Sequence, residues 1–191
     1  MNPRRCLLVL SFALLAASCG GAPVARVTSP FTASDATVFD QGVDFVDDPD
    51  ILDGHWEEDW TREFQHRVGA ADLIEVVNVV SLRTVTPPDE DPQYRIDIAP
   101  TRALLGDVMD VDLIAKSSDS GYSGIDTNQR RLASGTFLLF VKFVTAADGA
   151  VSAKWHLSPA SDKVLAHAQD LVNARSAPHG ADQGTVVEHT N

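Results

Sequence analysis

The chain has 191 residues, of which 44% are hydrophobic and 22% charged, and its formal net charge is −12. This composition is typical of a globular protein with one compact domain, and it is too polar for a protein that crosses a membrane several times. The excess of acidic residues excludes the basic surface that nucleic acids need, so we expect no nucleic-acid partner. The two cysteines, Cys6 and Cys19, lie in the first nineteen residues, so the rest of the chain has neither a disulfide nor a thiolate metal site.

The N-terminus predicts an export signal over residues 1–18. Arg4 and Arg5 provide a positive flank, and an apolar run of about ten residues follows them as far as Leu15. A run of this length is too short for a transmembrane helix, which needs roughly 20 residues. No later segment is long and apolar enough to be one.

The segment Leu15-Ala16-Ala17-Ser18-Cys19 resembles the lipobox of bacterial lipoproteins. The resemblance implies cleavage after Ser18, a diacylglycerol on the Cys19 sulfur and an acyl chain on the new amine. Two or more such chains anchor a protein stably in a membrane. Gly20 in the next position, rather than Asp, resembles lipoproteins that are forwarded to the outer membrane of a host with two membranes. The alternative is an ordinary signal peptide, with Cys19 a chance thiol.

Residues 19–53 predict a lipidated N-terminus followed by an acidic tether. Between Arg26 and Arg62 there are ten acidic residues and no lysine or arginine, and like charges extend a flexible chain. We therefore expect a spacer that holds a folded domain, residues 54–175, away from the membrane. Part of the spacer is apolar enough to dock on the domain, at Phe39, Phe45, Ile51 and Leu52.

The acidic stretch 44–54 invites a calcium-binding interpretation. An EF-hand loop needs acids at positions 1, 3 and 5, with glycine at position 6. Asp48 and Asp50 have the first spacing, but Leu52 stands where the third acid belongs. The frame that puts Gly54 at position 6 fails as well, so we expect a solvated acidic segment without a metal.

Residues 56–68 predict a helix before the strands. Apolar side chains recur at four-residue spacing, at Trp56, Trp60, Phe64 and Val68. Asp53 can cap the N-terminus, and Gly69 ends the pattern. We expect this stripe to pack in the core rather than to form a platform for a ligand.

Five later segments predict strands, at residues 71–85, 94–98, 109–113, 136–144 and 151–157. The first is β-branched and apolar on parts of both faces, as a bent barrel strand would be. The second, third and fifth alternate between apolar and polar residues. The turn at Ala147-Asp-Gly149 predicts a hairpin between the last two. Between the third and fourth strands there is room for a helix or a long loop.

A second helix is predicted after the strands. Ser158 would cap it and Pro159 would take its first position. Its buried stripe would be Val164, Leu165, Ala168, Leu171 and Val172. Beyond Ser176 the sequence has no periodicity, so residues 176–191 predict a disordered tail.

The strands predict an α+β protein, mainly β with flanking helices, built on a five-stranded OB-like antiparallel barrel with one helix before it and one after. Between residues 70 and 158, the runs 71–77, 104–106 and 132–140 also resemble netrin-like modules, the class that includes tissue inhibitors of metalloproteases. The resemblance implies the barrel fold. It does not imply inhibition, because those inhibitors depend on cysteines that this body lacks.

Residue types that carry chemistry are present without a catalytic pattern. Gly121-Tyr-Ser123-Gly124 is half of a nucleophile elbow, but position 125 is not the second glycine. No two of the six histidines lie three or four residues apart, as zinc ligands on one helix would. We expect His156 and His167 to be solvated. Asp110 and Asp112 share a strand face, which the alternation of that strand already explains.

The sequence therefore predicts a membrane-anchored cell-envelope lipoprotein with a small non-catalytic binding domain and no cofactor. Its partners would be the membrane, through the lipid on Cys19, and an envelope protein or ligand. Two alternatives remain open. One is an envelope hydrolase or metal-dependent enzyme whose site is assembled from distant residues, and the other is a netrin-like protease inhibitor.

Overall fold

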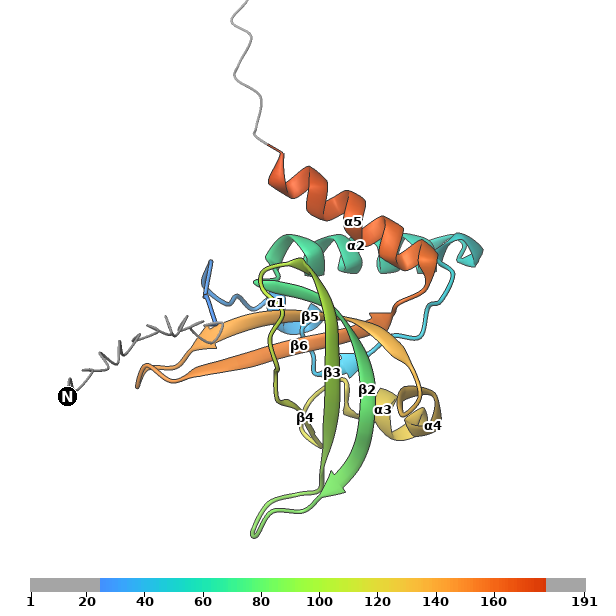
Figure 1. Cartoon of the computed structure of the whole chain (residues 1–191). Coiled ribbons are helices and arrows are strands. Elements are labelled where there is room, and N and C mark those ends of the chain that lie inside the picture. The colour runs from blue at the N-terminus through green and yellow to red at the C-terminus, as the bar shows by residue number, and fades with distance from the viewer. Residues whose placement is uncertain (1–24, 178–191) are drawn as a thin grey trace, which may run out of the picture.

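The computed structural model describes residues 25–177, which form a mixed α+β fold around one strongly curved sheet (Figure 1). The strands are β1 (Gly42–Val43), β2 (Leu73–Val85), β3 (Gln93–Leu105), β4 (Leu113–Lys116), β5 (Thr136–Thr145) and β6 (Val151–Pro159). The helices are α1 (Asp35–Val38), α2 (His55–Ala70), α3 (Tyr122–Thr127), α4 (Gln129–Leu132) and α5 (Asp162–Ser176), with a 3-10 turn η1 (Pro49–Ile51).

The sheet has six strands in the order β1-β6-β5-β2-β3-β4 and is almost closed into a barrel. Four of the five expected strands are present, and the third is displaced: residues 109–112 lie outside any strand, and β4 begins only at Leu113. The pairing of β2 to β6 is antiparallel throughout. The expected total of five is too low, because β1 adds a sixth strand that runs parallel to β6. Only two residues pair there, Gly42 with His156 and Val43 with Leu157. So short a strand has no alternation that a sequence pattern could reveal.

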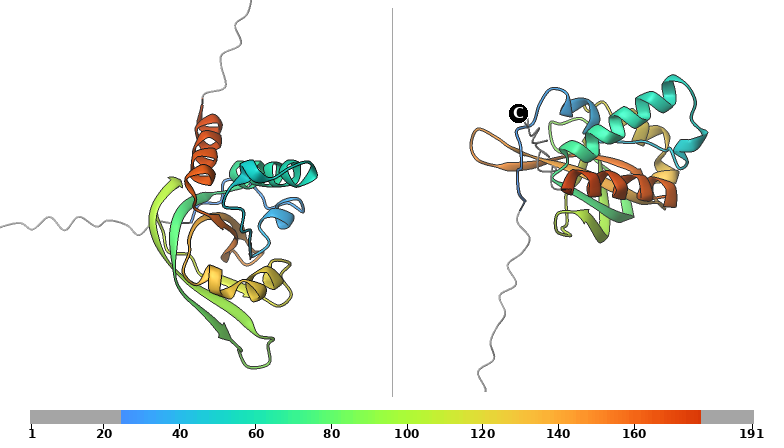
Figure 2. Two further views of the ribbon diagram at one scale, coloured as in Figure 1. Left: turned by 90° about the vertical axis from the view of Figure 1, so that its right-hand side faces the viewer. Right: turned by 90° about the horizontal axis from the view of Figure 1, so that it is seen from above.

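Strand β2 has apolar residues on both faces because it separates two cores. Its register with β3 shifts at three places, between Ile74 and Ser81, and such bulges bend and twist a strand. The bend lets β2 and β3 curve around the barrel and then project together as a long hairpin (Figure 2, left). The expectation of a bent barrel strand is confirmed.

The inner core fills the barrel, and the outer core lies between the sheet and two helices. Phe137, Leu139 and Trp155 belong to the inner core. Phe140 points the other way and meets Phe64 of α2 edge-on, with ring centroids 5.3 Å apart. Helices α2 and α5 run side by side over this outer face (Figure 2, right). Side chains on one face of a strand therefore pack in the inner core, and side chains on its other face pack in the outer core.

Helix α2 uses its predicted stripe except at the first position. Trp60, Phe64 and Val68 are buried, whereas the Trp56 side chain is 63% exposed. Trp56 lies in the first turn, and its ring is tilted against that of His55, with ring centroids 4.7 Å apart. The four-residue spacing determines which side of a helix is apolar. How far the helix overlaps the sheet determines at which residue burial begins.

Helix α5 starts later than the sequence predicts. Its N-cap is Ser161, whose side chain accepts a hydrogen bond from the Val164 amide at 3.2 Å. Ser158 and Pro159 remain in β6, where they pair with Leu138 and Phe137. The expected cap is wrong because the hydroxyl of Ser158 is engaged elsewhere, as described below. Val164, Ala168 and Val172 are buried as expected, while Leu165 and Leu171 are only partly buried.

Residues 25–53, which the sequence assigns to a tether, are part of the folded unit. Val38 and Phe39 lie in the outer core and are almost completely buried. Strand β1 extends the sheet, and Phe45 packs against the inner core. Of the residues expected to dock, Phe39, Phe45 and Leu52 pack on the domain, whereas Ile51 is 77% exposed and does not. Docking begins well before position 54.

Helix α3 covers part of the gap between the two ends of the sheet, β1 and β4. The Gly121 amide donates a hydrogen bond to the Asp40 carbonyl at 3.0 Å. A Cβ on Gly121 would lie 2.2 Å from the Gly42 Cα, so two backbones meet here at a distance that only glycine permits. The rest of the gap, toward the start of β6, is not covered by α3.

Candidate functional site

The acidic N-terminal segment obtains its counter-charges from the body of the protein. Four of its carboxylates form ion pairs with surface bases: Asp35 with His66 at 3.0 Å, Asp48 and Asp50 with Lys163 at 2.7 and 2.8 Å, and Asp47 with Arg131. These pairs bring together residues that are far apart in the chain. The segment therefore does not extend by self-repulsion, because most of its carboxylates lie beside basic side chains of the body.

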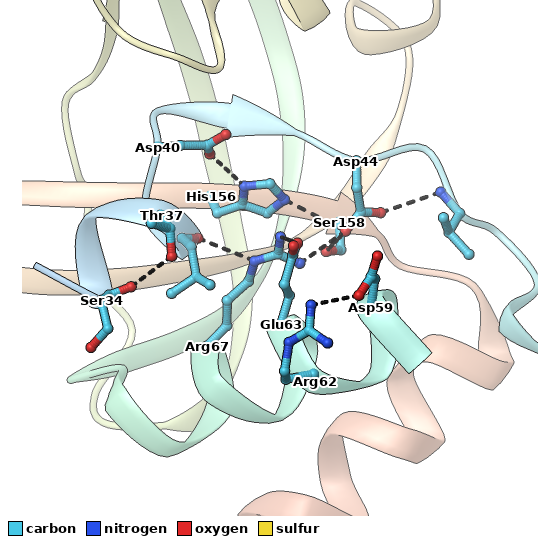
Figure 3. Close-up of polar contacts among 12 residues, drawn as sticks. Ser34, Thr37, Asp40, Asp44, Asp59, Arg62, Glu63, Arg67, His156 and Ser158 are labelled. Carbon is cyan, nitrogen blue, oxygen red and sulfur yellow. Dashed lines mark hydrogen bonds and ion pairs between the residues drawn. The ribbon is translucent and has the colours of Figure 1, made fainter. Parts of the chain in front are cut away.

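The most buried of these contacts form a polar cluster between α2, β1 and β6 (Figure 3). Arg67 lies at its centre and is only 4% exposed. Its Nη1 lies 3.2 Å from Asp44 Oδ2, and its Nη2 lies 3.2 Å from Glu63. Its Nε donates to the Val38 carbonyl at 3.1 Å. A buried guanidinium needs such partners, since an unpaired charge in a protein interior is strongly destabilising.

His156 joins this polar cluster from β6. Its Nδ1 lies 2.7 Å from Asp40 Oδ1, and its Nε2 lies 3.5 Å from Asp44 Oδ2. The ring is 4% exposed. The expectation of a solvated His156 is therefore wrong, because β1 and the residues before it cover the strand face that the alternation left polar.

The polar cluster contains a serine, a histidine and aspartates, but it lacks the geometry of a nucleophilic site. Ser158 Oγ donates to Asp44 Oδ2 at 2.6 Å, rather than to the histidine. Its side chain is fully buried. A serine nucleophile needs its proton to pass to a histidine and its oxygen to face a substrate. This arrangement provides neither, and it binds β1 to the core instead.

The charges of the polar cluster are mutually stabilised. Burial by itself would raise the pKa of Asp44, but the hydrogen bonds and charges of His156 and Arg67 outweigh it and hold this pKa below its usual value. The pKa of Asp40 is lowered in the same way against its burial, first by His156. Burial lowers the pKa of Arg67, and the Asp44 and Glu63 carboxylates oppose this effect. The three groups form one charged unit.

A second buried ion pair holds the start of the described chain. Lys142 and Asp72 both have fully buried side chains, and Lys142 Nζ lies 3.1 Å from Asp72 Oδ1. Lys142 also donates to Ser29 Oγ at 2.8 Å, and Asp72 accepts from the Thr28 amide at 3.0 Å. The segment that begins at Ala25 is thereby fixed to β5 and to the start of β2.

An apolar groove opens where the barrel is not closed, between β6 and the residues that precede and form β4. This barrel groove has a volume of about 430 Å³. Its lining is Ala25, Met109, Asp110, Val111, Asp112, Ile114, Phe143, Val151, Ser152, Ala153 and Trp155. Most of these side chains are apolar, and the charged ones are two aspartates. A concave apolar surface with a few polar groups is typical of a binding site.

Glu75 is a buried carboxylic acid close to the barrel groove. It is fully buried, and its Oε2 accepts a hydrogen bond of 3.3 Å from the amide of Met109, a groove residue. Its Oε1 has no hydrogen-bond partner among the described residues. Burial raises the pKa of Glu75 to about 7, and the charge of Asp110 adds to the shift while the Met109 amide opposes it.

The predicted lipidation site and cleavage position, Cys19 and Ser18, lie outside the described residues. Ser123 lies in α3, where its carbonyl accepts a hydrogen bond from Thr127. Asp110 and Asp112 both line the barrel groove, and Asp112 pairs with Arg95 at 2.7 Å. In the part of the chain that the structure describes, no three His, Cys, Asp or Glu side chains gather as metal ligands.

The segment considered for calcium binding has another role. Asp48 caps η1 by accepting a hydrogen bond from the Asp50 amide at 3.1 Å. Both carboxylates face Lys163. Their charges are therefore directed at the lysine of α5 and not at a shared metal ion.

Sequence reasoning missed the residues on which these contacts depend, namely Arg67, Lys142, His156 and Glu75. It also placed His167 on a solvated helix face, whereas its ring lies 5.8 Å from Trp60 and 5.2 Å from Phe64. One signal was available. Lys142 and Glu75 are charged residues inside otherwise apolar strands, and a charge in such a position requires a partner.

No family model matches this chain, and no curated protein sequence matches it. Between residues 25 and 177, no helix has the length and apolar character that crossing a membrane requires.

Proposed function

We propose that this protein is a lipid-anchored, non-catalytic binding protein of the cell envelope. Cys19 would carry the lipid, and the barrel would bind an envelope protein or ligand at the barrel groove. The observation that carries the proposal is the position of this groove. It is lined by Ala25, only six positions after Cys19 in the sequence.

The strand order supports the proposal that the barrel is of OB type. Five strands follow one another in the order β6-β5-β2-β3-β4, and α3 and α4 lie between the third and fourth of them in the chain. OB-type barrels are partly open and bind ligands on their surface. In this chain the gap between β4 and β6 leaves apolar side chains accessible at the barrel groove.

The contacts of the polar cluster also favour a binding role over an enzymatic one. His156, Arg67 and Asp44 are engaged with one another and with the N-terminal segment. Groups that are needed to fix a segment to the core are not available to activate a substrate. The polar cluster therefore supports a structural role for the residue types that an envelope hydrolase would use.

The anchor is tested by Cys19→Ser in the full chain. We expect the variant to leave the membrane fraction and to lose the mass of the acyl chains, because a single sulfur would carry the diacylglycerol. Cell fractionation and intact mass spectrometry measure both. Cys6→Ser is the matched control for general effects on export, because Cys6 is the other cysteine of the chain and lies outside the lipobox. Unchanged membrane attachment and mass in Cys19→Ser would refute the proposal.

The outer membrane is the proposed destination in a host with two membranes, because Gly20 rather than Asp follows Cys19. Gly20→Asp should then retain the protein at the inner membrane. Separation of the two membranes on a density gradient measures this. An unchanged distribution would remove the outer-membrane assignment while leaving the anchor itself in place.

A further inference from the structure

We propose that the barrel groove binds an extended, positively charged peptide segment of an envelope protein, which adds as a strand along the free edge of β6. This inference rests on the proposed function, because it names the kind of partner that the binding domain takes. Its basis is the pairing pattern of β6, the lining of the groove and the charge around it.

The edge of β6 is only half covered. Strand β1 pairs with His156 and Leu157, and the Gln41 amide donates to the Trp155 carbonyl at 3.0 Å. Gln41 has a positive φ of 54°, a left-handed conformation that turns the chain away from the edge at this point. The edge from Val151 to Lys154 therefore has no strand beside it in the described part of the chain.

The backbone groups on this edge point toward the missing strand. The carbonyl of Trp155 faces the β1 side, because it accepts from Gln41. In an antiparallel pair, residues two apart direct both backbone groups to the same side. The N–H and C=O groups of Ala153 and Val151 therefore point to the free side of β6. Such a row of unpaired groups is a template for an added strand.

The barrel groove provides an apolar surface for the side chains of such a strand. Ala153 and Val151 form one wall, with Phe143 and Trp155 beside them, and Met109 lies among the residues of the opposite wall. Val151 is 49% exposed, which is unusual for a valine that faces the barrel side of a strand. Alternate side chains of an added strand would cover these residues, while its backbone pairs with β6.

The charge of the groove selects a basic partner. Its charged lining residues are Asp110 and Asp112. Asp112 pairs with Arg95, but Asp110 has no ion pair among residues 25–177. With a net charge of −12 for the chain, an anionic lipid surface would be repelled, whereas lysine or arginine in a peptide would be attracted. The observations therefore favour a cationic peptide over a lipid.

The test titrates peptides against the full chain in neutral detergent. The probes are an octapeptide of alternating lysine and valine and its glutamate–valine counterpart, with fluorescence anisotropy as the readout. We expect the lysine peptide to bind and the glutamate peptide to bind at least tenfold more weakly. Equal binding of the two peptides, or no binding of the lysine peptide, would overturn the proposal.

Ala153→Pro tests the added strand, because it removes the outward amide of residue 153 and leaves the bonds to β5 in place. We expect about tenfold weaker binding of the lysine peptide, the effect of one lost backbone hydrogen bond and its unpaired acceptor. Asp110→Asn should weaken binding by about threefold. Asp170→Asn is the matched control, because Asp170 is an exposed acid on α5 that does not line the barrel groove. Unchanged binding in Ala153→Pro would contradict strand addition.

Hydrogen exchange provides a measurement that does not depend on any variant folding. The lysine peptide should slow exchange of the Val151 and Ala153 amides in the unmodified chain. Full protection of these amides without peptide would mean that residues 20–24 or a second copy occupy the edge, and it would overturn the proposal. Slower exchange of the same amides on addition of soluble short-chain phosphatidylglycerol, with no peptide present, would identify a lipid ligand instead and overturn the proposal. Membrane attachment through Cys19 is measured separately, so failure of the anchor and failure of the groove are distinguishable.

Discussion

Asp44 receives more polar contacts than any other carboxylate of the N-terminal segment. It accepts from Ser158 at 2.6 Å and from the Val46 amide at 3.2 Å, and it pairs with Arg67 at 3.2 Å. Through these contacts one aspartate links β1, β6 and α2. At the scale of single residues, the fold is held by charges whose partners lie in distant parts of the chain.

Asp44→Asn should therefore lower the free energy of unfolding by about 3 kcal/mol, because it leaves Arg67 buried beside a neutral partner. Denaturant titration at pH 7 measures the change. Asp59→Asn is the control, since the Asp59–Arg62 pair in Figure 3 is solvent-exposed and such pairs contribute at most about 0.5 kcal/mol. Equal losses in the two variants would show that the polar cluster does not stabilise the fold.

The same substitution has a predicted pH dependence. The pKa of Asp44 is lower in the folded protein than its usual value of 3.8. Its stabilising effect is therefore present above that value and is lost as the pH falls through the folded pKa. The difference in stability between the wild type and Asp44→Asn should be full at pH 7 and shrink below pH ~4. A constant difference from pH 7 to pH 3 would contradict this assignment.

Glu75 predicts the opposite pH dependence. Its pKa rises from 4.5 to about 7 on folding, so the wild type loses stability as the pH rises through this interval. Glu75→Gln removes the titrating group. The variant should be more stable than the wild type at pH 8 by roughly 2–3 kcal/mol, with a much smaller difference at pH 4. Thermal unfolding at both pH values measures this.

Glu90→Gln is the control for Glu75→Gln, because Glu90 lies on the exposed β2–β3 turn, 3.4 Å from Lys116. Its effect should be small at both pH values. A Glu75→Gln variant that is no more stable at pH 8 than at pH 4, relative to wild type, would show that Glu75 is not protonated in the folded state.

At the scale of elements, the junction of β1 and α3 depends on the contact between Gly42 and Gly121. Gly121→Ala should destabilise the protein by about 1–3 kcal/mol, because its Cβ would overlap the backbone of β1. Gly124→Ala, three residues further on and inside α3, is the matched control. A Cβ there would lie 3.7 Å from the Val43 carbonyl oxygen, an ordinary contact, and alanine favours helix formation.

Differential scanning calorimetry should give a lower Tm for Gly121→Ala and an equal or higher Tm for Gly124→Ala. Similar Tm values for the two variants would mean that α3 can shift without cost and does not close the barrel. The comparison tests the backbone contact, since both variants add the same methyl group, one at the N-cap of α3 and the other inside the helix.

At the scale of the whole molecule, the ordered N-terminal segment shortens the tether. Only residues 20–24 lie between Cys19 and the start of the described chain, which would limit Ala25 to about 20 Å from the lipid proposed for Cys19. The end of the barrel that carries Ala25 and the β5–β6 hairpin should therefore lie near the bilayer. A tether extending to residue 53 would allow any orientation.

This orientation is testable with fluorescent labels on single cysteines introduced into the lipidated protein. A label at Val151→Cys should be quenched more strongly by headgroup-labelled lipids than a label at Asp59→Cys, near the start of α2. Inserting a 20-residue Gly/Ser linker between Val24 and Ala25 should reduce the difference. The reverse order of quenching would contradict the short tether.

Much of the fold could be predicted because it depends on local patterns. The stripe Trp60, Phe64 and Val68, the strand at 136–144 and the turn at Ala147–Gly149 are visible in short windows of sequence. The hydrophobic period of a segment determines its secondary structure and its buried face. These elements were therefore predicted to within a few residues.

The polar cluster could not be predicted, because its contacts are long-range. Asp40 and His156 are 116 positions apart, and Asp44 and Ser158 are 114 apart. An acidic run with no base nearby indicates repulsion when only the local sequence is considered. In the folded chain the same acids pair with bases from α2, α4, α5 and β6, so the segment docks instead of extending.

By itself, the sequence determined the type and order of the main elements, since each depends on the spacing of apolar residues along a short stretch. Tertiary structure alone decided that residues 25–53 belong to the domain, that Ser158 remains in a strand, and that the barrel stays open beside Val151 and Ala153. The physical reason is that burial and charge pairing depend on which distant residues meet, and that is settled only when the whole chain packs.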